Sequence, residues 1–481
     1  MTTARRETPP QTAEAPPSRL AGTRTWVVIL AASLPVFMAT LDNLVVTNAL
    51  PVLQRELGAS VSQLQWFINA YALSFATFIL LAVALGDRLG RRRVFVTGIA
   101  VFTAASALCA VATSPETLIA ARALQGIGGA ALMPLSLAIL VGSVSPKLRP
   151  FSIGIWGGVA GLGVAVGPLV GGAIVQGMSW NAIFWLNVPV GLVAISLVCR
   201  ALLESYGARV RLDILGLVLA GLGVFGLVYG IINAPGGGWD TMGVRVTLSA
   251  GVLSLLIFVW WEGIPTHPLL PLRLFRDRSF SASISLGVAF SIGVFGSIFL
   301  VVQFFQVVQG YSPLMAGVLS MPWTMAPLVI SPLAGFLAPR FGTRALLLVG
   351  LSAQACGLAW IAIAMSPTVP YSHIVVAFAL EGLGMGLVVP PAATAVLANM
   401  SPRDHAKASG ANSTLREVGV ALGIAIVPAV FTASGGRFTP TEFADAAVPS
   451  LWTGVAFVVA AIVIATRLPA GRGAGGAAAE R

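Results

Sequence analysis

The chain has 481 residues, of which 57% are hydrophobic and only 9% are charged. A soluble globular domain carries roughly 25% charged residues, so this composition excludes a water-soluble fold and predicts a protein that lies in lipid. The net charge of +11 would suit a nucleic-acid-binding protein. We nevertheless expect no nucleic-acid partner, because the positions of the basic residues have another explanation.

Long uncharged stretches indicate membrane-spanning helices. Residues 57–86, 150–199 and 279–339 contain no charged side chain, and a bilayer core needs about 20 apolar residues per helix. The longest stretches must therefore hold pairs of helices with short connections. We expect fourteen spans, at residues 26–50, 64–85, 94–112, 117–141, 152–175, 182–203, 213–233, 244–263, 280–302, 313–337, 345–365, 371–398, 408–431 and 449–467.

The basic residues gather on one side of these expected spans. If the N-terminus is cytoplasmic, 23 of the 28 Lys and Arg residues fall in cytoplasmic segments and three in outer loops. This asymmetry follows the positive-inside rule. We therefore expect a multi-pass protein of the cell inner (plasma) membrane, surrounded by the lipid bilayer, with both termini in the cytoplasm. The Pro-, Ala- and Gly-rich ends, residues 1–24 and 468–481, are expected to be disordered cytoplasmic tails.

The second half of the chain repeats the first. The segment QGIGGAALMPLSLAILVGSVSPKLR begins at Gln125 and EGLGMGLVVPPAATAVLANMSPRDH begins at Glu381, with glycines and prolines in one register. Two parallel repeats of six helices around a central cavity are a known plan of transporters. We expect an N-terminal six-helix bundle at 25–203, a linker with two inserted helices at 204–279, and a C-terminal six-helix bundle at 280–467.

The segment GLGVAVGPLVGG, residues 161–172, places glycines and a proline inside an apolar span. Small residues four apart share one helix face and let backbones approach closely in lipid, and a proline bends a helix. We expect a bendable contact between two moving halves, with an ordinary static packing face as the alternative. The residues concerned are Gly163, Gly167, Pro168, Gly171 and Gly172.

The segment GDRLGRRR follows the second expected span. An Asp near a helix terminus can pair with an Arg, and a Gly allows a tight turn. A gating role in conformational change is expected for this loop, and a purely topogenic positive loop is the alternative. The residues are Gly86, Asp87, Arg88, Gly90 and Arg91.

Ionisable residues inside the spans are candidates for function, because a charge at membrane depth costs about 2.5–3.5 kcal/mol on insertion scales. Asp42 follows an uncharged stretch that begins at Trp26, and Arg122 lies within the fourth span. We expect Asp42 to couple protons and Arg122 to bias its proton affinity. The alternatives are a helix-end cap near the interface for Asp42 and a side chain that reaches the outer interface for Arg122.

Two further acids lie within spans of the second half. Glu417 follows Arg416, and neighbours on a helix point about 100° apart; we expect that the two do not face each other as a pair. Glu381 occupies the repeat position of Gln125. Glu417 and Glu381 are the second and third candidate proton sites, and a hydrogen-bonded packing role is the alternative for Glu381.

These motifs resemble those of the major facilitator superfamily, in particular its fourteen-helix drug:proton antiporters. The helix-5 glycines match that family's antiporter motif completely, whereas the loop carries Val83 where Gly is usual. LDNLVVTNALP, from Leu41 to Pro51, follows the family's helix-1 motif with its polar residue moved by one place. RALQGIGGA, from Arg122, follows the helix-4 motif. The resemblance covers nearly the whole chain except the tails.

The resemblance implies an all-α polytopic membrane protein of the major facilitator fold, with two pseudo-symmetric six-helix bundles and two inserted helices. It implies a proton-coupled efflux transporter for drugs, antibiotics or similar lipophilic small molecules, cations among them, working by alternating access as a monomer. No cofactor beyond the proton gradient is expected. From helix position alone, the expected substrate-binding residues are Asn43, Trp66, Asn69, Gln125, Gln303, Phe304, Trp323 and Met325.

Other function classes remain as alternatives at this point. An exporter or proton symporter of an endogenous metabolite would have a similar sequence, and a multi-span enzyme, a channel or a sensor is less consistent with the motifs. We expect no enzymatic activity and no catalytic residues, since no catalytic grouping emerges. We also expect no metal site, because the three histidines lack metal-ligand spacing and the three cysteines lie in apolar stretches.

Overall fold

The computed structural model describes residues 23–207, 213–265, 268–398, 400 and 405–469. In these residues it contains fourteen helical segments long and apolar enough to cross a membrane. The fourteen expected spans are thus confirmed, and the fold is all-α. The expected terminal tails lie largely outside the described residues.

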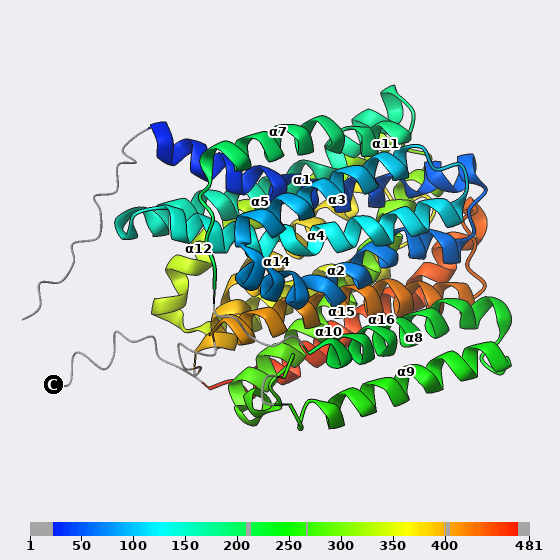
Figure 1. Cartoon of the computed structure of the whole chain (residues 1–481). Coiled ribbons are helices and arrows are strands. Elements are labelled where there is room, and N and C mark those ends of the chain that lie inside the picture. Colours follow the sequence, from blue (N-terminus) through cyan, green and yellow to red (C-terminus); the bar gives the residue numbers. More distant parts are fainter. Residues whose placement is uncertain (1–22, 208–212, 266–267, 399, 401–404, 470–481) are drawn as a thin grey trace, which may run out of the picture.

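Seven helices form an N-terminal bundle of six spans (Figure 1). They are α1 (Thr23–Leu57), α2 (Val61–Leu89), α3 (Arg91–Ala110), α4 (Pro115–Ser143), α5 (Arg149–Gly177), α6 (Asn181–Trp185) and α7 (Asn187–Ala201). The break between α6 and α7 precedes Pro189, whose ring conflicts with the carbonyl four residues earlier, that of Trp185. The expected sixth span is therefore one membrane crossing made of two helices.

The C-terminal bundle also has six spans and seven helices. They are α10 (Arg278–Val307), α11 (Pro313–Leu319), α12 (Met321–Phe341), α13 (Thr343–Ala364), α14 (Val375–Leu397), α15 (His405–Ala433) and α16 (Pro440–Ala465). Pro322 stands at the start of α12 and breaks this span as Pro189 breaks the sixth. Two inserted helices, α8 (Ile214–Gly237) and α9 (Met242–Trp261), pack on each other as a hairpin, and α8 lies against α2 and α15. Short 3₁₀ turns stand at Pro146–Leu148, Leu272–Arg276 and Tyr371–His373.

The same helix contacts recur in both bundles. A Cβ at Gly128 of α4 would lie 2.8 Å from the carbonyl oxygen of Gly98 in α3, and a Cβ at Gly384 of α14 would lie 2.6 Å from that of Gly350 in α13. Such backbone approach requires glycine on the crossing helix. The repeat seen in the sequence is thus a repeat of packing.

The two bundles touch at one end of the molecule and separate toward the other. We call the end where α1 begins and α16 ends the termini side (Figure 1), and the opposite end the far side. At the far side Gly172 of α5 lies against Pro313 and Leu314 of α11. Further along α5, a Cβ at Gly161 would reach Leu328 of α12 only at 3.4 Å, and one at Gly158 would meet no atom within 4 Å.

Hydrogen bonds join the bundles in the far half. Asn48 of α1 donates to the carbonyl oxygens of Pro168 at 2.9 Å and of Pro313 at 3.0 Å, and Gln306 of α10 donates to the Asn48 carbonyl at 2.8 Å. Gln65 of α2 donates to the Ile424 carbonyl of α15 at 2.9 Å. The interface between the bundles is therefore closed at the far side, while α5 and α12 diverge toward the termini side.

Two acids meet at the base of the α8–α9 hairpin on the termini side. Glu262 is buried and accepts a hydrogen bond from the Leu270 amide at 3.0 Å. Burial raises the pKa of Glu262 from 4.5 to about 7, and the nearby Asp213 charge adds to the increase. Asp213 caps the start of α8 and Glu262 caps the end of α9, so both acids lie at span ends.

We predict that the base of this hairpin is more stable at pH 5 than at pH 8. A carboxyl group whose pKa is raised on folding stabilises the fold while protonated, and the contribution is lost as pH rises from 4.5 to about 7. The difference corresponds to about 3 kcal/mol. Hydrogen exchange of residues 262–274, corrected for intrinsic rates, should show the loss in the native chain and not in Glu262→Gln. Asp240→Asn, at the exposed far end of the hairpin, is the control and should behave as the native chain.

Candidate functional site

A cavity of about 360 Å³ lies between the two bundles, in the middle of the spans. Helices α1, α2, α4 and α5 contribute to one wall, and α10, α12, α14 and α15 contribute to the other. The volume falls in the range of about 300–1,000 Å³ that small-molecule sites occupy. Because the cavity lies between the bundles, movement of one bundle against the other would open or close the path by which a ligand enters it.

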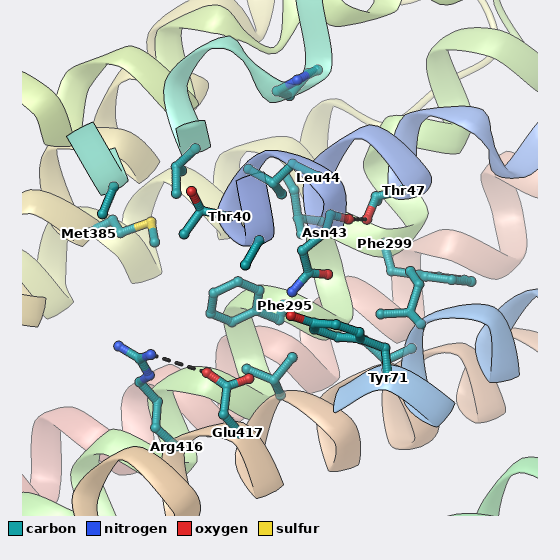
Figure 2. Close-up of a pocket in the computed structure, with 18 of the residues that line it drawn as sticks. Thr40, Asn43, Leu44, Thr47, Tyr71, Phe295, Phe299, Met385, Arg416 and Glu417 are labelled. Carbon is teal, nitrogen blue, oxygen red and sulfur yellow. Dashed lines mark hydrogen bonds and ion pairs between the residues drawn. The ribbon is translucent and has the colours of Figure 1, made fainter. Parts of the chain in front are cut away.

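The wall of the cavity is mainly apolar and aromatic. Phe295 and Tyr71 face each other across it, with Asn43 above them and Met385 at one side (Figure 2). Polar groups are few, a pattern that suits lipophilic ligands. The other aromatic and sulfur-containing lining residues are Phe75, Met133, Phe290, Phe299 and Trp323.

Both Arg416 and Glu417 line the cavity, and they form an ion pair of 3.1 Å (Figure 2). Our expectation that they would not pair is therefore wrong. Neighbouring Cβ atoms diverge on a helix, but a long Arg side chain folds back across the helix surface and reaches the carboxylate of the next residue. The pair is half-exposed, because the Arg416 side chain is 38% exposed and that of Glu417 is 15%.

Asp42 lies in the interior of the N-terminal bundle and is only 3% exposed. It is a mid-helix residue of α1, not a helix-end cap. Arg122 of α4 is fully buried and binds the Asp42 carboxylate at 2.6 Å, so it does not extend to the outer interface. A buried ion pair needs further hydrogen bonds to offset the desolvation of both charges.

Gln125, Asn187 and Phe67 supply such bonds. Gln125 and Asn187 donate to the second oxygen of Asp42 at 3.0 Å and 2.6 Å, and both also donate to the Ser106 hydroxyl. The Arg122 guanidinium donates to the Gln125 side-chain oxygen at 2.7 Å and to the Phe67 carbonyl oxygen at 2.9 Å. Helices α1, α2, α3, α4 and α7 thus meet at one charged centre.

Tyr71 separates this centre from the cavity. Its ring lies 4.6 Å from the guanidinium carbon of Arg122, a cation–π distance, and the same residue lines the cavity. Neither Asp42 nor Arg122 is among the lining residues. A ligand in the cavity therefore meets the charged pair through one aromatic ring.

Glu381 is buried in the C-terminal bundle and does not line the central cavity, although Ile298 borders both that cavity and the void beside Glu381. It accepts a hydrogen bond of 2.5 Å from the Gln354 side chain, and it borders a separate void of about 10 Å³. Its other oxygen has no hydrogen-bond partner among the described residues. The structure thus places Glu381 apart from Glu417 and from Asp42.

The helix-5 glycines have two different partners. Gly163, Gly167 and Gly171 pack on α1, within the same bundle; a Cβ at Gly167 would lie 2.8 Å from Leu44. This corrects the expected contact between moving halves for these three residues, because their face of α5 is turned inward. Gly172 and Pro168 instead meet α11 of the other bundle.

The GDRLGRRR loop is tied to its own bundle. Gly90 has φ +113° and makes the turn between α2 and α3, and Asp87 binds Arg91 at 2.8 Å. Glu204, after α7, accepts hydrogen bonds from the first amides of α3, those of Arg92 and Arg93. Gly86, at the start of this segment, packs on Leu135 of α4, whereas Arg88 is exposed.

Only two residues of the expected substrate-binding set, Asn43 and Trp323, line the cavity as the structure describes it. The others are placed elsewhere by packing. Trp66 packs in tilted ring contacts against Phe225 and Tyr229 of α8, and Gln125 belongs to the Asp42 centre. Gln303 bonds within its own helix, Asn69 and Phe304 are buried in the protein, and Met325 is half-buried outside the cavity wall.

The sequence analysis missed three residues of this region: Asn187 and Ser106 at the charged centre, and Tyr71 between that centre and the cavity. A buried amide within the sixth apolar span was the available signal for Asn187. Nothing in the sequence distinguishes Ser106 or Tyr71 from other small or aromatic residues of the spans.

Two six-span bundles around a central cavity, with a buried ion pair beside it, define the architecture of a secondary transporter. Comparison with known proteins identifies the group. The sequence matches the Major Facilitator Superfamily over residues 32–424 and again over residues 284–476. The chain belongs to this superfamily and is a multi-pass membrane protein.

Several relatives are resistance proteins. The chain is 34% identical over 451 residues to the tetracenomycin C resistance and export protein of Streptomyces glaucescens, covering 93% of this chain and 84% of the relative. It is 36% identical over 456 residues to the puromycin resistance protein Pur8 of Streptomyces alboniger, covering 92% and 90%. Among solved structures, a bacterial homologue of the human lysosomal transporter Spinster, in an inward-facing conformation, has a TM-score of 0.60 at 20% identity, covering 92% of this chain and 97% of that one.

We predict that Gly172→Leu weakens the closed far side. Its added side chain would collide with the backbone of Pro313 and Leu314, and overpacking costs about 1–3 kcal/mol, enough to lower the closed population by about tenfold. The measurement is the disulfide yield between Gln176→Cys and Leu314→Cys, in a background without the three native cysteines.

Two other glycines of α5 serve as comparisons. Gly177→Leu, where nothing lies within 4 Å, should leave the yield unchanged. Gly167→Leu should impair the transport cycle more than ligand binding, through the α1–α5 contact. An unchanged disulfide yield in Gly172→Leu would show that the far-side contact does not control closure, and unchanged turnover in Gly167→Leu would show that the transport cycle does not depend on close α1–α5 packing.

Proposed function

We propose that this chain is a proton-driven exporter of small lipophilic molecules, drugs and antibiotics among them. The observation that carries the proposal is the position of the Asp42–Arg122 pair, one aromatic ring away from a central cavity between two bundles. The names of the relatives, which include export and resistance proteins for tetracenomycin C and puromycin, support export as the direction.

We propose that the protein lies in the plasma membrane with the termini side in the cytoplasm. Basic residues at helix ends and connections gather on that side, which is the arrangement that the positive-inside rule describes. They include Arg88, Arg91, Arg92, Arg93, Arg200, Arg273, Arg276, Arg278, Arg340, Arg344 and Arg467. In this orientation the divergence of α5 and α12 gives the cavity a cytoplasmic entrance, so cargo enters from inside.

Helix α1 connects the proton site with the closed far side. Asp42 binds Arg122, and six residues further along the same helix Asn48 holds Pro168 and Pro313. Protonation of Asp42 removes its attraction for Arg122 and so loosens α1 from α4. In the outward-facing state, this shift of α1 lets Asn48 re-form its hydrogen bond to Pro313 of the other bundle, which closes the far side again.

The cycle follows from these contacts. Cargo binds in the cavity from the cytoplasm, the bundles rock about the cavity, and the far side opens. A proton from outside reaches the Asp42 centre while the cavity faces outward, and its release to the cytoplasm resets the pair. The protein thus carries cargo out as protons move in, with the gradient as its energy source and no enzymatic step, and we propose that it works as a monomer.

We predict that Asp42→Asn abolishes proton-driven export while the protein still folds. Asn keeps the shape and the hydrogen-bond acceptor but cannot take up a proton. In everted vesicles acidified inside, accumulation of puromycin should fall by at least about tenfold, corresponding to 1.4 kcal/mol or more. A normal gel-filtration profile of the purified variant checks that unpaired Arg122 has not unfolded the bundle.

Asp240→Asn, which alters an exposed ion pair in the α8–α9 loop, is the matched control and should transport normally. Full proton-driven transport by Asp42→Asn would remove Asp42 from the mechanism. Accumulation that is driven in the opposite direction by the same gradient would instead identify a symporter.

A further inference from the structure

The cavity wall carries one positive and one negative side chain. Arg416 and Glu417 are the charged residues among those that line it, and they bind each other at 3.1 Å. Among the residues that the structure describes, all other lining side chains are uncharged. The formal charge that the wall presents to a ligand is therefore zero.

The charges behind the wall also balance. Asp42 and Arg122 form a second one-to-one pair behind the Tyr71 ring. Glu381 faces its own small void within the C-terminal bundle and does not line the cavity. A ligand thus meets two dipolar pairs and no uncompensated carboxylate.

The remaining surface offers ring stacking and isolated hydrogen-bonding groups. The Trp323 side chain is almost fully buried, and its indole N–H has no partner among the described residues, although a buried indole N–H usually has one. Trp323 lines the cavity, but its indole nitrogen is buried in the wall, so it offers a ligand its ring and not this N–H. The Asn43 amide, close to Tyr71 in Figure 2, adds a neutral polar group.

We propose that the Arg416–Glu417 pair makes this cavity selective for net-neutral aromatic molecules and excludes permanent monocations. The inference rests on the proposed export function and specifies its cargo. A cation that enters the cavity loses hydration, which is costly unless an opposite charge compensates for it. Arg416 already balances Glu417, so the wall offers a cation no net opposite charge, whereas an uncharged ring system loses little hydration.

The test measures binding of two probes of similar aromatic character to the purified full-length protein. N-phenyl-1-naphthylamine is uncharged at neutral pH, and tetraphenylphosphonium is a permanent cation. The native protein should bind the neutral probe and bind the cation weakly. Arg416→Gln removes the balancing charge and leaves Glu417 unpaired in the cavity, so its affinity for tetraphenylphosphonium should rise by about tenfold or more, and the gain should shrink in high salt.

Two further variants complete the test. Arg340→Gln removes the same charge from the termini-side end of α12, outside the cavity wall, and should leave both affinities unchanged. Glu417→Gln leaves Arg416 unpaired and should instead raise the affinity for 2-naphthoate, an aromatic anion, by a similar factor. This reciprocal variant keeps the proposal testable if Arg416→Gln does not fold.

The outcomes separate the charge inference from the export function. If the native protein binds and exports tetraphenylphosphonium as well as Arg416→Gln does, export stands and the charge selection is wrong. If the probes bind as expected but no cargo moves with the proton gradient, the export function is wrong and the charge selection of the cavity stands.

Discussion

A charge pair held out of water organises the N-terminal half of this transporter. Asp42 and Arg122 are nearly or fully buried, and removing one partner of such a pair typically costs about 3–5 kcal/mol because the other is left uncompensated. Gln125, Asn187 and the Phe67 carbonyl add hydrogen bonds to the pair, although one guanidinium nitrogen of Arg122 has no partner among the described residues. Five helices therefore depend on the charge state of one carboxyl group, which lets a single proton alter the packing of a whole bundle.

The second bundle repeats the helix packing of the first, but it does not repeat the buried Asp42–Arg122 pair. Gly163 of α5 packs on the Phe37 carbonyl of α1, and Gly419 of α15 packs on the Val288 carbonyl of α10. When α1 and α10 are aligned on these two contacts, Gly293 of α10 occupies the position of Asp42. In the other pair of matching helices, Phe378 stands at the place of Arg122 and Glu381 at that of Gln125. The C-terminal bundle thus keeps the close helix contacts, and its described residues contain no ion pair at the matching positions. It contributes instead the Arg416–Glu417 pair, which lies in the cavity wall and meets cargo directly.

Helix α5 shows how one element serves both a fixed and a changing contact. The face with Gly163, Gly167 and Gly171 holds α5 to α1 within one bundle. The other face runs from close contact at Gly172, through a looser contact at Gly161, to open space at Gly158. Because side chains are minimal along both faces, the helix can remain fixed to α1 while its contact with the other bundle shortens or lengthens.

The sequence by itself determined the number of spans and the all-α class, because charged residues are costly in lipid and are therefore nearly absent from the spans. It showed the repeat as well, through glycines and prolines in one register. It also singled out Asp42, Arg122 and Glu417, since an ionisable residue at membrane depth is conspicuous. Only the tertiary structure decided which side chains face the cavity: Tyr71 does, and Gln303 does not. The reason is physical. A helix surrounded by lipid and by other helices is apolar on every face, so hydrophobic periodicity does not mark its inner side, and side-chain direction is set by packing between distant segments. The Arg416–Glu417 pair depends likewise on side-chain conformations that helix geometry alone does not specify.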